Sequence, residues 1–503
     1  MLVANSRATG RDRGRGWPAL AALSLSVVVV GLDTTVLNVA LPTISAELRA
    51  GTEALQWVVD AYLLAVIAVM LPAGRLGDRF GHRRALLVGL FVFGVGSVAS
   101  ALSTSVGELI TARAVQGAGA AVLVPLALAI VTTEFPQDQR ARALGLLTSA
   151  VALGLPLGPL VGGALLARWS WASVFWVNVP VVVLAIATVV VAVPVRPGRR
   201  DVRLDAIGVV ASAVGLVSLV GAVIQAPSSG WTSPRTLVLV AVALAAMAAF
   251  AANLRRSRHP LVDVALFGDR RFCGGVVAVA GASAVLLAVL FVLPQLLQGV
   301  RGFDAPSAAL RLLPLMVGLL VAGAAGARLQ RAWGTRTTAV AGLLVLAAGA
   351  GGLAAAGPEA PQWLFAGLLT ITGSGIGAAV STAMDAAMST VPDTAAAAGS
   401  ALINTLRQIS GALAVAALGS LLAATYANHL RPAVAGLPPS SRGLALGSLS
   451  GAGALHRLGL EQAAASAFTT GVGAVLLACS GLALACAATT WMVLPSTRVR
   501  PPA

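Results

Sequence analysis

The stretch "GRLGDRFGHRRALL", from Gly74 to Leu87, gathers four arginines, a histidine and one aspartate between two long apolar segments. The chain of 503 residues is otherwise poor in charge, with 10% charged and 58% hydrophobic residues and a mean hydropathy of +0.90. Soluble domains carry about 25% charged residues, so this composition excludes an ordinary soluble protein. Apolar runs of about 20 residues, enough to cross a bilayer as a helix, recur along nearly the whole chain. The sequence therefore predicts an all-α membrane protein with many spans.

Fourteen spanning helices are expected, and the arginines predict their orientation. All 34 basic residues are arginines; 24 lie in segments that this count places on the side of the N-terminus, and eight lie on the opposite side. Since basic loops stay in the cytoplasm, the bias predicts a multi-pass protein of the cell membrane with both termini cytoplasmic. It also accounts for the net charge of +16 without a nucleic-acid partner. The expected spans are 18–42, 55–74, 84–104, 108–133, 141–166, 172–194, 205–225, 235–254, 273–298, 306–327, 337–356, 361–384, 399–425 and 467–495.

A second basic stretch repeats the first. "ARLQRAWGTR", from Ala327 to Arg336, agrees with "GRLGDRFGHR" at five of ten positions, one aromatic pair included, and Arg331 stands where Asp78 does. Each stretch follows the second span of a six-span half, which predicts two pseudo-symmetric six-helix bundles with the substrate site where they meet. The expected organisation is a tail (1–17), a first bundle (18–194), two additional helices (205–254), a second bundle (273–495) with an external loop at 429–466, and a tail (496–503).

Several motifs carry a family resemblance. "GRLGDRFGHRR" resembles the loop signature of the major facilitator superfamily, and further motifs resemble its fourteen-helix drug:proton antiporter branch. The resemblance implies the major facilitator fold and proton-coupled export of hydrophobic or amphipathic small molecules such as drugs or antibiotics. It also implies that the proton gradient is the energy source and that no cofactor is needed. We expect a functional monomer. The branch motifs are "GLDTTVLNVALPTI" (31–44), "WVVDAYLL" (57–64), "ARAVQGAGAA" (112–121), "GLPLGPLVGG" (154–163) and "NTLRQISGALA" (404–414).

The first stretch is expected to form a cytoplasmic gate. By resemblance, Asp78 is a latch that closes the cytoplasmic side, with Arg79 and Arg83 in the same charge network. Gly74 and Gly81 permit a tight turn and close approach of helices. A positive-inside loop alone would explain the arginines, but it would not explain the single acid or the glycine spacing.

Three ionisable residues inside spans are the expected proton-coupling group. Asp33 lies in hydrocarbon, where an ionised and unpaired acid costs several kcal/mol, so it is a candidate proton carrier; the alternative is a structural acid paired with Arg113. Arg113 needs a partner for the same reason, and the resemblance links it to proton transfer. For Asp60, three interpretations stay open: titration together with Asp33, attraction of a cationic substrate, or an interfacial acid that touches water.

"GLPLGPLVGG" matches the antiporter signature Gly-x-x-x-Gly-Pro-x-x-Gly-Gly at every fixed position. The resemblance implies a rocking hinge of exporters, and the generic alternative is tight helix packing along a smooth groove. The hinge residues are Gly154, Gly158, Pro159, Gly162 and Gly163.

Polar residues inside other spans are candidates for lining the cavity. Arg407 is expected to line the inner vestibule, with Asp385 either its partner or an interfacial acid without a role. Tyr62 has an alternative interpretation as an interfacial anchor. The cavity candidates are Asn38, Tyr62, Gln116, Gln295, Asp385, Asn404 and Arg407.

Other classes of protein remain as alternatives. The three cysteines and four histidines have no metal-ligand spacing, so no metal site is expected. A phosphate-binding loop needs a lysine, and the chain has none, which excludes ATP-driven export by this chain alone. We do not expect an enzyme, although a membrane enzyme, an exporter or importer of a defined metabolite (sugar, amino acid or siderophore), and a non-transporting membrane sensor are the competing hypotheses.

Overall fold

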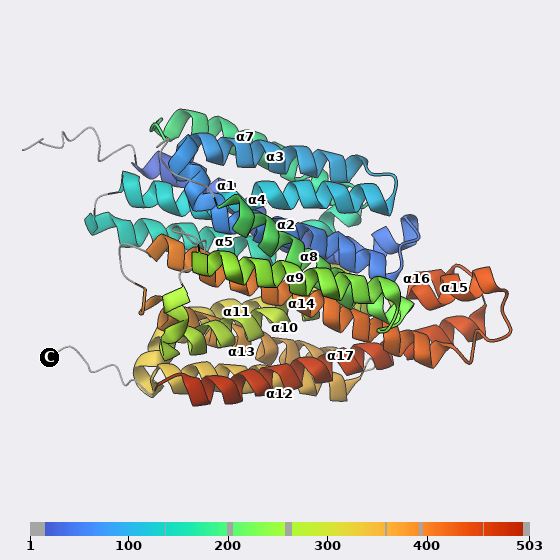
Figure 1. Ribbon diagram of the computed structural model, residues 1–503. Coiled ribbons are helices and arrows are strands. Elements are labelled where there is room, and N and C mark those ends of the chain that lie inside the picture. Colours follow the sequence, from blue (N-terminus) through green and yellow to red (C-terminus); the bar gives the residue numbers. More distant parts are fainter. Residues whose placement is uncertain are drawn as a thin grey trace, which may run out of the picture.

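The computed structural model describes residues 16–135, 137–198, 205–256, 264–357, 360–391, 396–455 and 457–495, and every predicted span appears in it as helix (Figure 1). Thirteen helices in this part of the chain are long and apolar enough to cross a membrane. The remaining span is α5, a helix of 30 residues whose described apolar segment is Leu157–Leu166. The all-α membrane fold is therefore confirmed. The predicted tails, apart from Gly16 and Trp17, lie outside the described residues.

The helices form two bundles with a helix pair at their junction (Figure 1). The first bundle holds α1 (Gly16–Glu47), α2 (Thr52–Phe80), α3 (His82–Leu102), α4 (Val106–Glu134), α5 (Gln137–Leu166), α6 (Ser173–Trp176) and α7 (Asn178–Ala192). The additional pair is α8 (Ala206–Ser229) and α9 (Pro234–Arg256). The second bundle holds η1 (Val264–Gly268), α10 (Arg270–Gly299), α11 (Ala305–Trp333), α12 (Thr335–Ala356), α13 (Gln362–Met388), α14 (Ala396–Leu430), α15 (Pro439–Gly447), α16 (Leu449–Gly453) and α17 (Leu458–Val493).

The two basic stretches have the same backbone design. α2 continues through the first stretch to Phe80, where a single glycine, Gly81, joins it to α3. α11 continues to Trp333, and Gly334 joins it to α12 in the same way. Gly81 has φ 91° and ψ 128°, and Gly334 has φ 84° and ψ 159°, a region of backbone conformation that only glycine adopts readily. The two repeated stretches of sequence therefore form turns of similar conformation.

Two ends of the molecule differ. We call the end at which α1 begins and α17 finishes the tail face, and the opposite end, which carries α15 and α16, the hairpin face (Figure 1). The bundles meet where α2 packs against α14 and α5 against α11. α8 packs on both α2 and α14, so the additional pair covers one of these two seams.

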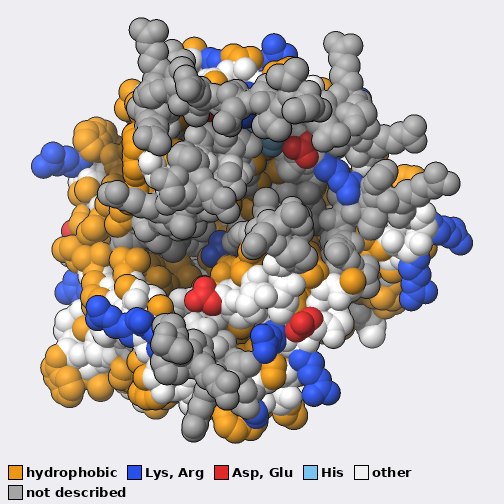
Figure 2. Space-filling model, turned by 90° about the vertical axis from the view of Figure 1, so that its left-hand side faces the viewer, with side chains coloured by type: hydrophobic (Ala, Val, Ile, Leu, Met, Phe, Trp, Pro, Cys, Tyr) orange, Lys and Arg blue, Asp and Glu red, His pale blue; other side chains and the backbone are white. Residues whose placement is uncertain are grey.

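The bundles are joined near the hairpin face. Gln56 Nε2 donates to the carbonyls of Val415 and Ala416, at 3.2 and 2.9 Å, and Gln298 Nε2 donates to Val39 O at 2.9 Å. Two more hydrogen bonds between the bundles, from Ser45 to Ser450 and from Thr52 to Gly447, also lie near the hairpin face. The tail face is hollowed near its centre (Figure 2). The bundles are thus joined by hydrogen bonds near the hairpin face, and the hollow lies on the tail face.

Several boundaries differ from the prediction, and three of these differences have a local cause. The loop expected from Gly74 is helical as far as Phe80, because charged residues beyond the bilayer continue a helix without penalty. The sixth span is divided into α6 and α7, since Pro180 lacks the N–H that would bond to the carbonyl of Trp176. The last helix begins at Leu458 instead of 467, because the alanine-rich segment before the span favours helix.

Candidate functional site

A buried ion pair occupies the core of the first bundle. Arg113 Nη1 of α4 lies 2.8 Å from Asp33 Oδ2 of α1, and the two side chains are 2% and 0% exposed. Gln116 joins them, since its Nε2 donates to Asp33 Oδ1 at 2.8 Å and its Oε1 accepts from Arg113 Nη1 at 2.7 Å. A cation in a span needs such a partner, and the structure supplies the pairing that was one of the two interpretations of Asp33.

Two further residues of this network were missed from the sequence. Asn178, at the start of α7, donates from Nδ2 to Asp33 Oδ1 at 2.9 Å and to Ser97 Oγ of α3 at 3.2 Å. Ser97 Oγ in turn donates to Phe175 O at 2.8 Å. Asp33 therefore accepts hydrogen bonds from three different side chains. The only signal in the sequence was a lone polar residue within an apolar run, which does not reveal its partner.

Tyr62 of α2 packs its ring against the guanidinium of Arg113. Its ring centroid lies 4.2 Å from Arg113 Cζ, a cation–π contact, and the side chain is 1% exposed. α4 comes close at this point because Gly117 has no side chain; a Cβ atom there would lie 3.0 Å from Tyr62 Cα. The interpretation of Tyr62 as an interfacial anchor is wrong, because the ring is enclosed by protein.

Asp60 lies on the face of α2 opposite to Tyr62. Its side chain is fully shielded from solvent, and neither carboxylate oxygen has a hydrogen-bond partner. One turn before it, Gln56 contacts α14 and Trp57 packs against Gly221 of α8. Residues 60 and 62 are separated by about 200° around the helix, so Asp60 faces away from the Asp33 network. The expectation of an interfacial acid in contact with water is wrong, since α8 and α14 cover this face.

A small enclosed space lies where the bundles meet beside the ion pair. Its volume is about 10 Å³, the size of roughly one water molecule. Asn38, a predicted cavity residue, lines it and donates from Nδ2 to Thr34 O at 3.2 Å. Arg113 therefore reaches the wall of the junction between the bundles. The lining residues are Thr34, Leu37, Asn38, Val59, Tyr62, Leu63 and Arg113 from the first bundle and Leu287 and Val415 from the second.

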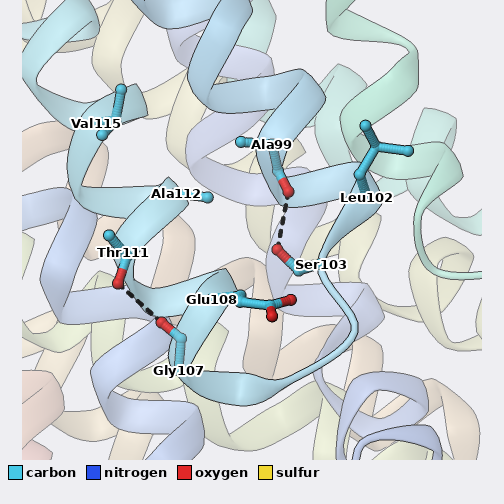
Figure 3. A pocket seen from close by; sticks show the side chains of 8 residues that line it. All are labelled: Ala99, Leu102, Ser103, Gly107, Glu108, Thr111, Ala112 and Val115. Atoms are coloured by element: carbon cyan, nitrogen blue, oxygen red, sulfur yellow. Dashed lines mark hydrogen bonds between the residues drawn. The ribbon is translucent and has the colours of Figure 1, made fainter.

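A larger groove lies on the outside of the first bundle, around the turn between α3 and α4 (Figure 3). It has a volume of about 620 Å³, and Leu102 on its edge is 64% exposed. Its acid, Glu108, accepts hydrogen bonds from Thr104 N at 2.8 Å and Thr104 Oγ1 at 3.1 Å. Because these bonds cap the start of α4, Glu108 has a structural role. The groove is separate from the junction of the bundles.

Comparison with known proteins agrees with this architecture. The model of the Major Facilitator Superfamily matches residues 23–415. The chain belongs to this superfamily. The tetracenomycin C resistance and export protein of Streptomyces glaucescens is 32% identical over 97% of this chain and 93% of its own length. The multidrug resistance protein Stp of Mycobacterium tuberculosis is 33% identical over 82% of this chain and 77% of its own.

A solved structure agrees with the fold. The bacterial homologue of the human lysosomal transporter Spinster, in an inward-facing and unoccupied conformation, superposes with a TM-score of 0.68 at 18% identity, covering 95% of this chain and 97% of that one. The likeness shows that the two proteins share a fold.

Asp78, the acid of the predicted gate, pairs differently from the prediction. Asp78 Oδ1 lies 3.3 Å from Nε2 of His82, at the start of α3, and Asp78 is exposed on the tail face. Arg79 instead stacks over the ring of Phe80, with its Cζ 5.6 Å from the centroid. The expected network of Asp78 with the two arginines is therefore wrong for this conformation.

Two other residues of the predicted gate, Arg83 and Gly81, stabilise the turn between α2 and α3. Arg83 Nη2 donates to Val190 O of α7 at 2.6 Å. Gly81 is required by its positive φ, and a Cβ atom there would also lie 2.6 Å from Arg196 O. Gly74 makes no close approach, because nothing lies within 4 Å of the position of a Cβ atom; that part of the prediction is wrong.

The glycines of the predicted hinge let α5 approach the backbone of α1. A Cβ atom at Gly154 would lie 2.8 Å from Gly31 Cα, and one at Gly158 would lie 2.8 Å from Val36 N. At Gly162 the nearest atom is Val36 Cγ2, at 3.0 Å. The predicted groove is therefore present, and the rocking function of the segment stays a prediction.

The end of the same segment touches the second bundle. A Cβ atom at Gly163 would lie 2.9 Å from both Ala309 Cβ and Pro306 Cα of α11, while Pro159 is buried. The α5–α11 seam thus has a close approach near the hairpin face, as does the α2–α14 seam, where a Cβ atom at Gly419 would lie 3.0 Å from Gln56 Cγ.

The cavity candidates of the second bundle do not form a cluster. Asp385 is exposed near the end of α13, and no ion pair joins it to Arg407 among the described residues, so their predicted pairing is wrong. Asn404 Nδ2 donates to Ser400 O at 3.0 Å on its own helix. Gln295 is 8% exposed and also bonds to its own helix, at 2.7 Å. Among the described residues, therefore, no acid forms an ion pair with Arg407, although this cation lies in a span.

Proposed function

We propose that the chain is a proton-coupled antiporter of the cell membrane that exports hydrophobic or amphipathic small molecules by alternating access. The tail face is cytoplasmic in this proposal, in line with the distribution of the arginines. Relatives named as resistance and export proteins support export, and the two bundles with their hairpin-face contacts supply the moving parts.

The observation that carries the proposal is the contrast between the two buried acids. Asp33 accepts hydrogen bonds from Arg113, Gln116 and Asn178, an environment that stabilises a carboxylate. Asp60 is fully buried with no partner for either oxygen. A charge without compensation in such a place costs far more than a neutral carboxylic acid. Asp60 is therefore the proton carrier, protonated in this conformation, and Asp33 is a fixed charge in the core of the first bundle.

The helices around Asp60 explain how proton release is linked to movement. Within its membrane segment α8 carries no charged residue, α14 carries Arg407 and α4 carries Arg113. Glu53 lies at the start of the same helix as Asp60, and His429 lies near the end of α14. Because α2 belongs to one bundle and α14 to the other, tilting of the bundles uncovers Asp60 to water, where it can lose its proton.

The energy available fits export. One proton that crosses 100 mV releases about 2.3 kcal/mol, which supports roughly 50-fold accumulation of a substrate. In the opposite conformation, with the tail face closed, Asp78 acts as the latch. This step is part of the proposal, because in the present structure Asp78 lies beside His82.

Everted membrane vesicles test the function. Addition of a substrate to vesicles with an imposed pH gradient is expected to dissipate that gradient when the chain is present. The Asp60→Asn variant, expressed to the same level, is expected to leave the gradient unchanged. A sensor would leave the gradient unchanged in both cases, and an exporter of one defined metabolite would respond to that compound alone in a panel of unrelated drugs.

A further inference from the structure

Arg407 is a charged residue in the spanning region that the mechanism above does not use. It lies 11 residues from the start of α14, about 16 Å along the helix, and within the apolar segment Leu402–Leu430. Its side chain is partly exposed although protein surrounds it, and its Nε is sealed from solvent without a partner. Partial exposure deep among helices means that the guanidinium borders an internal space.

The contacts of α14 show where the internal space beside Arg407 lies. Along one edge α14 meets α2, where a Cβ atom at Gly419 would lie 3.0 Å from Gln56 Cγ. Along another edge it meets α10, where Ser410 Oγ donates to Ala280 O at 2.9 Å. Arg407 precedes Ser410 by three residues, so it lies on that side of α14, one turn nearer the tail face. The hydrogen bonds of Gln56 and Gln298 between the bundles lie nearer the hairpin face than this position, and the tail face is hollowed (Figure 2).

Within the part of the chain that the structure describes, no acid pairs with Arg407. Asp33 balances Arg113, Asp60 is neutral in the proposed mechanism, and Asp385 is exposed elsewhere. An isolated cation within a span is costly, and in this conformation only water offsets the cost. An oxyanion on a ligand would offset it better, since a guanidinium can donate two parallel hydrogen bonds to a carboxylate or sulfonate.

We propose that Arg407 recognises an acidic group of the exported compound, so that the preferred substrates are amphipathic monoanions with an apolar body and one carboxylate, sulfonate or ionised hydroxyl group. This inference rests on the proposed function and adds the charge of the substrate to it. Such a compound enters the vestibule from the tail face and places its anion on the guanidinium, while its apolar part contacts the aliphatic walls.

The inference has an electrical consequence. Export of a monoanion in exchange for one proton moves two charges in the direction favoured by a negative interior. Export of a monocation in the same exchange moves no net charge. Transport of the anion is therefore accelerated by the membrane potential, whereas transport of the cation responds to the pH gradient alone.

Two matched probes separate these cases in everted vesicles: a dansyl amide of taurine, which carries a sulfonate, and a dansyl amide that carries a trimethylammonium group in its place. With the unmodified protein, we expect uptake of the sulfonate to fall at least threefold when potassium and valinomycin abolish the potential at constant pH gradient. This measurement needs no variant, so it is independent of the effect of a substitution on folding.

Variants then test the residue. Arg407→Gln is expected to reduce sulfonate uptake at least tenfold with little change for the trimethylammonium probe, and Arg407→Lys is expected to restore part of it. The matched control is Arg235→Gln, at the exposed start of α9. Uptake of the cation but not the anion by the unmodified protein, or an equal loss of both probes in Arg407→Gln, would overturn the inference and leave the antiport function standing. If neither probe is taken up and the pH gradient is not dissipated, both the inference and the antiport function are overturned.

Discussion

Arg113 Nη1 lies 2.8 Å from Asp33 Oδ2 in a site that solvent does not reach, so each side chain is the compensation for the other. Removing one of them leaves an uncompensated charge in the bundle, which costs about 3–5 kcal/mol for a buried pair. We expect Asp33→Asn and Arg113→Gln each to lower the thermal unfolding temperature of the purified protein in detergent. The double variant should lose much less than the sum of the two. Strictly additive losses would show that the pair contributes nothing.

Efflux by the same variants gives a separate outcome. Asp33→Asn is expected to abolish proton-coupled efflux while expression is retained, because Asn178 and Gln116 then bind a neutral amide that no longer fixes the position of Arg113. Undiminished efflux by Asp33→Asn would remove this residue from the mechanism.

Asp60 is expected to behave in the opposite way in a stability measurement. In Asp60→Asn a neutral amide replaces what we propose is a neutral carboxylic acid, so the free energy of unfolding should change by less than about 1 kcal/mol. Proton exchange should be lost, because the amide cannot release a proton. Thermal unfolding and the collapse of a pH gradient measure the two effects on one preparation.

The control for Asp60 is Glu53→Gln, which removes an acid from the first turn of the same helix. It should leave both readouts unchanged. Strong destabilisation by Asp60→Asn, or proton exchange that persists in it, would contradict the assignment of Asp60 as a protonated carrier.

The repeated turns give a prediction about backbone conformation. Gly81 and Gly334 have φ of 91° and 84°, where a side chain costs about 1–3 kcal/mol. Gly81→Ala and Gly334→Ala are each expected to destabilise the protein by that amount, and their effects should add because the turns belong to different bundles. Gly74→Ala is the matched control, since its Cβ atom would meet nothing within 4 Å and alanine favours helix by about 0.5–1 kcal/mol. Equal effects at all three positions would contradict the argument from φ.

The apolar runs were sufficient to predict the spans, because a bilayer demands about 20 apolar residues wherever a helix crosses it. The repeat was also readable, since Gly81 and Gly334 occupy the same place in both stretches and take the same conformation. Arg113 and Asp33 were predictable as a pair because each needs an opposite charge and few are available inside the spans.

The partners of Asp78 and Asp60 were not predictable, for different reasons. Four arginines and a histidine lie within a few residues of Asp78, and only the conformation selects His82 among them. The surroundings of Asp60 depend on α8 and α14, which are far away in the sequence and carry no motif that points to α2. Asn178 was missed because a polar residue in an apolar run does not indicate which helix it faces.

The hairpin face offers a direct test of alternating access. Ser45 Oγ at the end of α1 lies 2.7 Å from Ser450 Oγ of α16, and Thr52 Oγ1 donates to Gly447 O at 3.4 Å, so the α15–α16 segment of the second bundle is fastened to the first. These contacts must separate if the hairpin face opens. In a background in which Cys273, Cys479 and Cys486 are replaced by serine or alanine, Ser45→Cys together with Ser450→Cys is expected to form a disulfide that abolishes efflux, and a reductant should restore it. Each single cysteine variant should retain efflux with or without oxidant. Full efflux by the cross-linked protein would mean that these contacts stay intact during transport, and the conformational cycle would then have to open the hairpin face elsewhere.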